Sequence, residues 1–227
     1  EEKVPIVFSS AGNPKTYTTL LKEHGIKVAH VVSSSKFALK AQEAGCDAVV
    51  AEGFEAGGHN GREETTTMVL IPAVCKAVDI PVIAAGGIAT GKQLLAAQVL
   101  GASGVQIGSR FLATHEASSH INFKNTIINL NEGDTTLSLK KLTPVRLIKN
   151  KFYEQVADAE NRGASIEELK MLLGRGRAKK GMFEGDLEEG ELEVGQVSAL
   201  LDKIQSAAEV VDEIWKEYLE CKERLIG

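Results

Sequence analysis

One histidine stands in a glycine-rich segment that directly follows an apolar run. Residues 51–61 have the sequence AEGFEAGGHNG, so that four glycines accompany His59. An imidazole exchanges protons near neutral pH, and glycines let the backbone approach a flat ligand closely. His59 is therefore the leading candidate for an acid/base group. The alternative, a histidine that only hydrogen-bonds a loop carbonyl, stays open.

Glycines follow two further apolar runs in the same way. Residues 83–88 have the sequence IAAGGI, and residues 105–110 have the sequence VQIGSR. Backbone N–H groups in such turns bind phosphate well. We expect the amides of Gly87, Gly108 and Ser109, with the Ser109 hydroxyl, to bind a phosphate monoester.

The segment between these two turns also bears on that site. In barrel enzymes, the loops after the last two strands often form a phosphate site together with a helix N-terminus. Thr90 and Gly91 are expected to begin such a helix. Arg110 would assist only if its side chain points to the same face; otherwise we expect a solvated or ion-paired arginine.

Carboxylates flank the histidine loop. Glu52 and Glu55 form a pair that could hold a metal or share acid/base work, whereas Glu52 alone could accept hydrogen bonds from a ligand. Glu63 and Glu64 are interpreted as a solvated rim beside Arg62.

The four remaining histidines are expected to be structural. His24 precedes a glycine at a helix end, His30 lies within an apolar run, and His115 and His120 follow the last of these runs. No two histidines have the spacing of a helix-borne metal site, so we expect no metal.

Composition bounds the class of protein. A chain of 227 residues that is 43% hydrophobic and 25% charged is ample for one globular core. The net charge is -5, and a basic run at 175–180 is followed by an acidic run at 184–193, which disfavours nucleic acid as a partner. No apolar run approaches the roughly 20 residues that a membrane span needs, and the first residues do not resemble a signal peptide.

Cysteine usage points to the compartment. Cys46, Cys75 and Cys221 are widely spaced and form no CxxC pair. Neither a disulfide framework nor a zinc site is therefore expected. We expect a reducing, cytoplasmic setting.

The first half of the chain alternates short apolar runs with helical segments, which is typical of a parallel sheet with crossover helices. Five strands are expected, at residues 4–8, 26–32, 46–51, 80–85 and 104–107. Each glycine-rich loop then follows a strand, at the face where barrels and doubly wound sheets carry function. The fold class is α/β. Five units are too few for a closed (β/α)8 barrel, so we expect a TIM barrel that lacks its first strands.

The second half is expected to be mainly helical. Residues 1–115 would form a cofactor-binding barrel with strands 4 to 8, residues 116–196 a smaller helical lid domain, and residues 197–227 a closing helix. Apolar residues recur at helical spacing in that last stretch, from Leu200 to Leu219. A core-facing helix is favoured there over a partner-binding helix.

Three of these segments carry a family resemblance. Residues 51–61, 80–88 and 104–113 resemble the flavin-dependent nitronate monooxygenases, formerly 2-nitropropane dioxygenases, a family that includes the bacterial enoyl-acyl-carrier-protein reductase II. The resemblance covers essentially the whole chain and implies an FMN-binding (β/α)8 barrel with a smaller helical domain. It also implies that His59 is catalytic. The residues it places at FMN, together with their neighbours in the same turns, are Glu52, Gly57, Gly58, Gly86, Gly87, Gln106, Ile107, Gly108 and Ser109.

The resemblance leaves two chemistries. A reductase passes hydride from NADPH or NADH through FMN to a trans-2-enoyl thioester in fatty acid synthesis, whereas a monooxygenase oxidises alkyl nitronates with FMN and oxygen. Residues 65–68 (TTTM), 185–186 and 195–196 resemble the reductase, which is the favoured prediction. The link from His59 to the threonines, residues 60–64, is longer than the corresponding link in typical reductases. This difference counts against the reductase.

Two further possibilities stay open. The chain could be an inactive fragment, because missing strands would leave two sheet edges unpaired. A phosphate-sugar enzyme on the same barrel would need the glycine turns but no flavin. The expected partners are a small or acyl-carrier-protein-bound substrate and, from the family and the apolar last helix, a second copy in a homodimer.

Overall fold

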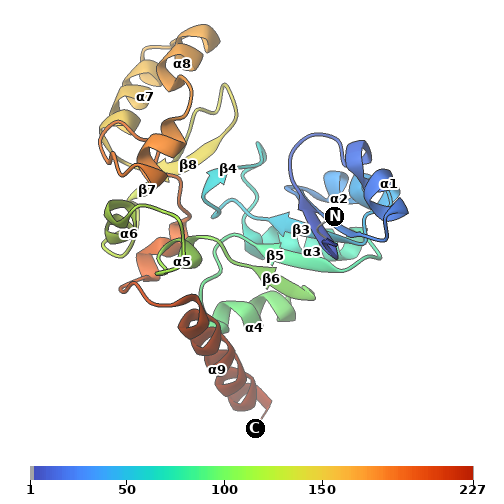
Figure 1. Cartoon of the computed structure of the whole chain (residues 1–227). Coiled ribbons are helices and arrows are strands. Elements are labelled where there is room, and N and C mark those ends of the chain that lie inside the picture. Colours follow the sequence, from blue (N-terminus) through green and yellow to red (C-terminus); the bar gives the residue numbers. More distant parts are fainter. Residues whose placement is uncertain (1–2, 227) are drawn as a thin grey trace.

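The computed structural model describes residues 3–226 and contains one curled parallel sheet (Figure 1). The five strands lie in the order β1-β2-β3-β5-β6, and every neighbouring pair is parallel. Their bounds are β1 Ile6–Ser9, β2 Lys27–Val32, β3 Ala48–Glu52, β5 Val82–Ala85 and β6 Gly104–Gln106. The predicted parallel α/β arrangement is confirmed, and the sheet forms a curled half-barrel.

A helix follows each of the first four strands of this sheet. These helices are α1 Lys15–Glu23, α2 Ser35–Glu43, α3 Thr67–Ala77 and α4 Gly91–Val99. Local sequence explains the ends of two of them. The Ser34 hydroxyl accepts from the Phe37 amide to cap α2, and Gly45 follows its end with a φ of 87°.

The main core lies between the sheet and its helices. Alternate strand residues face the helices, among them Val28, Val49 and Val82, and pack with α3 residues such as Ile71 and Val74. The residues between them face the concave side of the half-barrel. A smaller cluster there contains Ala29, Val50 and Ala85.

Within residues 3–226 the sheet remains open at β1 and β6. Ile6 and Phe8 are 51% and 53% exposed. Phe8 is registered with Ala29, so both aromatic and small side chains lie on the concave side. The open concave side leaves the carboxyl ends of all five strands accessible along one rim.

A second, antiparallel sheet lies beside the first, with the order β4-β8-β7 (Figure 1). Its strands are β4 Gly58–His59, β7 Thr135–Ser138 and β8 Val145–Ile148. The prediction of a helical segment over 116–196 missed β7 and β8, because four-residue strands leave little periodic signal. Helices in the same part are α5 Ser109–Leu112, α6 Ile121–Ile127, α7 Lys151–Asn161 and α8 Ile166–Leu173, with a π-helical turn at Lys179–Phe183.

The closing helix α9 spans Ala207–Ile226, so its predicted start at residue 197 was wrong. Residues Gln196–Leu200 form a 3-10 helix instead. The predicted apolar stripe is divided: Ile214 and Tyr218 are buried, whereas Trp215 is 55% exposed.

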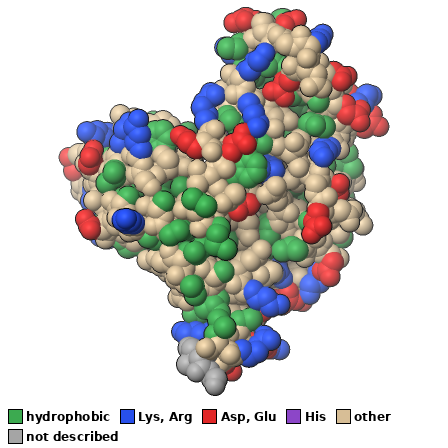
Figure 2. All heavy atoms as spheres, turned by 180° about the vertical axis from the view of Figure 1, so that it is seen from behind, with side chains coloured by type: hydrophobic (Ala, Val, Ile, Leu, Met, Phe, Trp, Pro, Cys, Tyr) green, Lys and Arg blue, Asp and Glu red, His purple; other side chains and the backbone are tan. Residues whose placement is uncertain are grey.

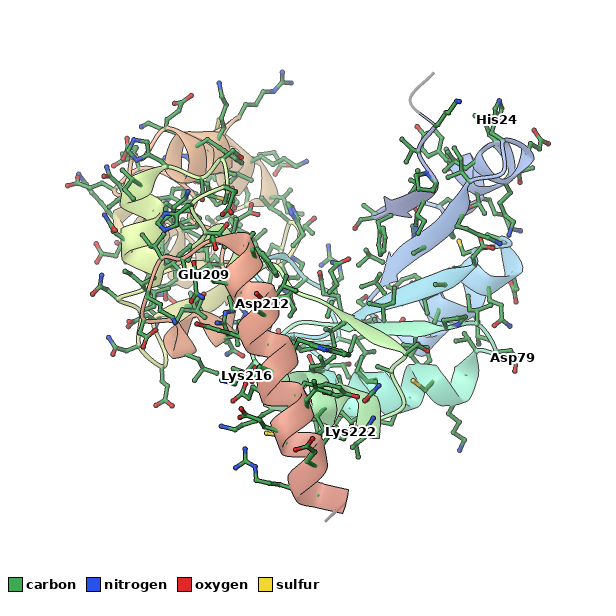
Figure 3. All side chains as sticks on the ribbon, turned by 60° about the horizontal axis from the view of Figure 1, so that its bottom comes forward. His24, Asp79, Glu209, Asp212, Lys216 and Lys222 are labelled. Carbon is green, nitrogen blue, oxygen red and sulfur yellow. The ribbon has the colours of Figure 1, made fainter. Side chains whose placement is uncertain are left out.

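Two views place α9 in the molecule. Hydrophobic side chains gather in the lower middle of the face shown in Figure 2, next to the projecting helix. Figure 3 shows the labelled α9 residues Glu209, Asp212 and Lys216 along the helix, away from the C-terminal end of α1, where His24 lies. Among residues 3–226, none of the helices has both the length and the apolar character to cross a membrane.

The crossing of α4 and α9 depends on one glycine. A Cβ added at Gly91 would lie 2.2 Å from the Tyr218 nitrogen and 2.4 Å from the Ile214 oxygen. Gly91→Ala should therefore lower the free energy of unfolding by about 2 to 3 kcal/mol, because the α9 backbone must move. Gly104→Ala is the matched control, since nothing lies within 4 Å of that added carbon. Urea unfolding should separate the two variants, and equal midpoints would contradict this packing.

Candidate functional site

Two adjoining hollows lie at the carboxyl ends of the strands and share Glu52 as a lining residue. The smaller has a volume of about 250 Å³ and the larger about 820 Å³. The smaller hollow brings together many of the predicted cofactor residues: Glu52, Gly57, Gly86, Gly87, Gln106, Gly108 and Ser109. The larger hollow contains His59 and Asn60 beside Glu52.

Unpaired donors line the smaller hollow. The backbone N–H groups of Gly87, Gly108 and Ser109 donate to no protein acceptor among residues 3–226. The Ser109 Oγ accepts from the Gly195 amide at 2.9 Å, which leaves its own O–H free to donate. Gly87 has a φ of 67°, a conformation that favours glycine. This donor set suits a phosphate.

Neither the start of α4 nor Arg110 contributes to this donor set. The Gly91 amide donates to Glu217 Oε2 at 2.7 Å, and Thr90 forms a capping box with Gln93. Arg110 donates to the Ala89 carbonyl at 2.6 Å and pairs with Glu213 on α9. Of the two roles considered for Arg110, the structure therefore shows the ion-paired one.

A buried arginine holds the histidine loop in place. Arg146 on β8 is 1% exposed, and its Nε and Nη2 donate to the Phe54 carbonyl at 3.1 and 2.9 Å. Its guanidinium carbon also lies 4.4 Å from the centroid of the Phe54 ring. Desolvation lowers the pKa of Arg146, while the charges of Glu55 and Glu64 oppose that shift. The second sheet thus anchors the loop that carries His59.

Glu55 is a second anchor of the same loop. Its carboxylate accepts from the Thr67 amide at 2.9 Å and from the Thr67 hydroxyl at 2.8 Å. These hydrogen bonds join the histidine loop to the first residue of α3, so Glu55 has a structural role. No group of three or more His, Cys, Asp or Glu side chains within residues 3–226 is arranged to hold a metal, so the metal interpretation of the Glu52 and Glu55 pair has no support here.

Glu52 is the titratable group that the two hollows share. It ends β3 and is half-buried. Burial raises its pKa to about 7, which leaves the carboxyl group divided between its neutral and charged forms near neutral pH. The side chain can therefore act as a hydrogen-bond donor or acceptor toward a ligand.

His59 is exposed and lies on β4, where it is registered with Val145. Asn60 fixes the turn beside it, because its side-chain amide donates to the Ala56 carbonyl at 2.9 Å and the Gly58 carbonyl at 3.1 Å. The Asn60 backbone amide donates to the Pro144 carbonyl at 2.8 Å. His59 is thus a solvent-accessible imidazole on a braced backbone.

The other histidines form hydrogen bonds within the fold, and one of them, His30, also lines the larger hollow. A His24 ring nitrogen bonds to the Leu20 carbonyl at 2.9 Å, and His24 lines neither hollow. His30 is buried, lies 2.8 Å from the Ser9 hydroxyl and has its pKa lowered by desolvation. His120 caps α6 by accepting from the Asn122 amide, and the His115 amide donates to the Gln205 carbonyl.

Two of the predicted cofactor residues do not line the smaller hollow. Ile107 packs against the main core between sheet and helices, and Gly58 is the first residue of β4 and is not among the residues that line this hollow. Sequence analysis in turn missed a wall supplied by distant residues, namely Met182, Glu193, Val194 and Val197. In this segment the sequence pointed only to residues 185–186 and 195–196, through the family resemblance. A Cβ at Gly57 would lie 2.5 Å from the Val194 carbonyl carbon, so the two segments touch along their backbones.

The sequence is similar to a family of known proteins along most of its length. Residues 1–217 match a family described as nitronate monooxygenase. A probable nitronate monooxygenase of Staphylococcus saprophyticus is 37% identical over 173 residues, which are 71% of this chain and 48% of that protein. A putative monooxygenase of Mycobacterium tuberculosis is 34% identical over 215 residues, which are 90% and 56% of the two chains. This chain spans about half the length of these curated relatives.

Solved structures extend the likeness to the whole chain. FabK from Thermotoga maritima is 42% identical with a TM-score of 0.93, covering 100% of this chain and 71% of that one. A nitroalkane oxidase from Streptomyces ansochromogenes is 28% identical with a TM-score of 0.80, covering 99% and 67%. The barrel-type α/β fold predicted from the sequence is confirmed.

Arg146 offers a direct test of how the loop is held. Arg146→Met should lower the free energy of unfolding by about 2 kcal/mol, because the Phe54 carbonyl loses its buried donor. The control is Arg62→Met, which removes an exposed arginine that donates to the Lys140 and Leu142 carbonyls. The control should change stability by less than about 0.5 kcal/mol in denaturant unfolding. Similar losses of stability in both variants would contradict the anchoring role of Arg146.

Glu52 predicts a pH dependence of stability. Burial raises the pKa of Glu52 in the folded protein from the usual 4.5 to about 7, so ionisation of the carboxyl group destabilises the native state progressively as pH rises between these values. Glu52→Gln should therefore be more stable than the parent by about 1 to 2 kcal/mol at about pH 8, after allowance for partial exposure. The difference should vanish near pH 4. Chemical denaturation at both pH values measures it, and a pH-independent difference would contradict the assignment.

Proposed function

The chain belongs to the nitronate monooxygenase family, and we propose from this premise and the site geometry that it acts as an FMN-dependent oxidoreductase. The observation that carries the proposal is the donor set of the smaller hollow. The unpaired amides of Gly87, Gly108 and Ser109 fit the phosphate of FMN. The adjoining larger hollow extends from Glu52 to His59 and offers room beyond the phosphate.

The chemistry divides between cofactor and protein. Bound FMN supplies electron and hydride transfer, which no amino-acid side chain provides. The protein residues bind and orient FMN and the substrate. The side chains of Gln106 and Ser109 line the smaller hollow and would hydrogen-bond FMN there, and Glu52 would offer a donor or acceptor between the two hollows.

His59 is proposed as the catalytic residue. Its exposed imidazole lines the larger hollow, where a substrate would have access from solvent. An imidazole in this place can give a proton to the substrate or stabilise negative charge on it. The braced turn at Asn60 limits the backbone positions that His59 can take.

The favoured activity is that of an enoyl-acyl-carrier-protein reductase II. FabK, a protein of that activity, is 42% identical over this entire chain, compared with 28% for the nitroalkane oxidase. The substrates would then be NADPH or NADH and a trans-2-enoyl thioester, carried by an acyl carrier protein. Oxidation of alkyl nitronates is the second candidate, because the curated relatives are described as probable or putative monooxygenases.

Anaerobic stopped-flow absorbance of the FMN-loaded protein distinguishes the two activities. Rapid loss of flavin absorbance on mixing with NADPH or NADH, reversed by crotonyl thioester, is the expected result. Bleaching only by an alkyl nitronate would establish the monooxygenase instead. A protein that binds no flavin would contradict both activities and favour a phosphate-sugar enzyme.

Replacement of His59 separates catalysis from cofactor binding. His59→Ala should reduce turnover per bound FMN by about 10² to 10⁴-fold, because a positioned proton-transfer group is lost. Flavin content should stay at the parent value, since His59 lies outside the smaller hollow. His24→Ala is the matched control and should retain normal turnover. Loss of flavin with normal turnover per remaining FMN would contradict the catalytic role.

A further inference from the structure

Residues 193–197, called the wall segment below, form one side of the smaller hollow. Glu193, Val194 and Val197 line the hollow from this segment. At its start the segment is attached to the second sheet, because a bridge registers Glu193 with Leu147 on β8. The contacts that follow along the segment therefore decide how closely it covers the hollow.

Two consecutive backbone amides tie the wall segment to loops at the strand ends. The Gly195 amide donates to Ser109 Oγ at 2.9 Å, and the Gln196 amide donates to the Glu55 carbonyl at 2.9 Å. A Cβ added at Gly195 would lie 2.8 Å from the Glu55 carbonyl oxygen and 2.9 Å from Ser109 Oγ. Gly195 has a φ of -78°, which any residue can adopt, so glycine is needed there for space.

Of these two ties, the one at Ser109 can also reach a ligand. The Glu55 carboxylate is already engaged by the amide and hydroxyl of Thr67, and its carbonyl is a backbone group. Ser109 lines the smaller hollow, and a serine hydroxyl can donate one hydrogen bond while it accepts another. Its Oγ accepts from Gly195, and among residues 3–226 no acceptor binds its hydrogen. The hydroxyl can therefore donate to a ligand without giving up its bond to the wall segment.

We propose that Ser109 is a positioning residue that links the phosphate of the bound cofactor to the wall segment. A hydroxyl that donates a hydrogen bond becomes a better acceptor, so a phosphate bound by Ser109 strengthens the bond from the Gly195 amide. Occupancy of the phosphate end thus fixes the wall segment against the hollow. The inference rests on the proposed function in placing a phosphate at this end.

The test measures hydrogen exchange of the Gln196 backbone amide, whose acceptor on Glu55 is unaltered by substitutions at Ser109. With FMN at about 100 times its Kd, exchange should slow by at least about tenfold relative to the flavin-free protein, and mass action sets a ceiling of about 100-fold. Riboflavin at the same multiple of its own Kd should slow exchange by less than about threefold, because it has no phosphate for Ser109 to bind.

Variants at two serines separate this coupling from a merely structural tie. Ser109→Ala should bring the effects of FMN and riboflavin on the Gln196 amide to within about twofold of each other. Ser109→Thr keeps the hydroxyl and should restore most of the difference. Ser198→Ala is the matched control, because it removes a buried hydroxyl that has no hydrogen-bond partner among residues 3–226. The control should keep the difference seen in the parent, whereas a merely structural tie at Ser109 would change only the exchange rate without ligand.

Equal slowing by FMN and riboflavin in the parent protein would overturn the proposal. A difference between the two flavins that persists in Ser109→Ala would overturn it as well. If that variant does not fold, the comparison of the two flavins in the parent still decides, since it needs no substitution.

The outcomes also separate this inference from the proposed function. Flavin-supported turnover with equal slowing by both flavins would refute the positioning role alone. If the protein binds neither flavin, the proposed function fails, and inorganic phosphate becomes the probe. Slower exchange of the Gln196 amide with phosphate in the parent, but not in Ser109→Ala, would then support the coupling by itself. No slowing with phosphate would refute both.

Discussion

The buried Arg146 guanidinium is the constraint on which the arrangement of the site depends. It binds the Phe54 carbonyl from a strand of the second sheet, while Phe54 belongs to the loop that leaves β3 of the first sheet. Burial of an unpaired carbonyl or an unpaired guanidinium would each be costly, so the two sheets are held in one relative position. His59 and the wall containing Glu193 both depend on that position, because β8 also pairs with β4 and bridges to Glu193.

Local sequence patterns were sufficient to predict the strands of the first sheet. Each of its five strands overlaps the predicted run within a few residues, because apolar strands, helices and glycine turns alternate there at regular length. The second sheet could not be predicted in the same way. β4 has two residues, and β7 and β8 have four each, so their pairing depends on distant contacts. The start of α9 was missed because apolar spacing continues through residues 200–204, where a 3-10 helix and an extended segment replace the helix.

The candidate site shows the same division. Sequence alone pointed to the glycine turns and to Glu52, and these lie together around one hollow. The opposite wall comes from residues in the segment 182–197. Residues 185–186 and 195–196 of that segment carried the family resemblance, but no local sequence pattern shows that the segment approaches the histidine loop. Close backbone contact between Gly57 and Val194 requires glycine, and that requirement becomes visible only when both segments are in place. Each of the two walls carries a half-buried carboxyl group, Glu52 on one and Glu193 on the other. Burial raises the pKa of both groups.

In the proposed function, the unpaired amides at Gly87, Gly108 and Ser109 hold the phosphate of a flavin mononucleotide. The decisive measurement is a flavin-fluorescence titration of the flavin-free protein with FMN and with riboflavin, because the two ligands differ only by the phosphate. We expect FMN to bind more tightly by at least about tenfold, because the phosphate receives charge-assisted hydrogen bonds. Equal affinity for the two flavins, or binding of neither, would contradict it.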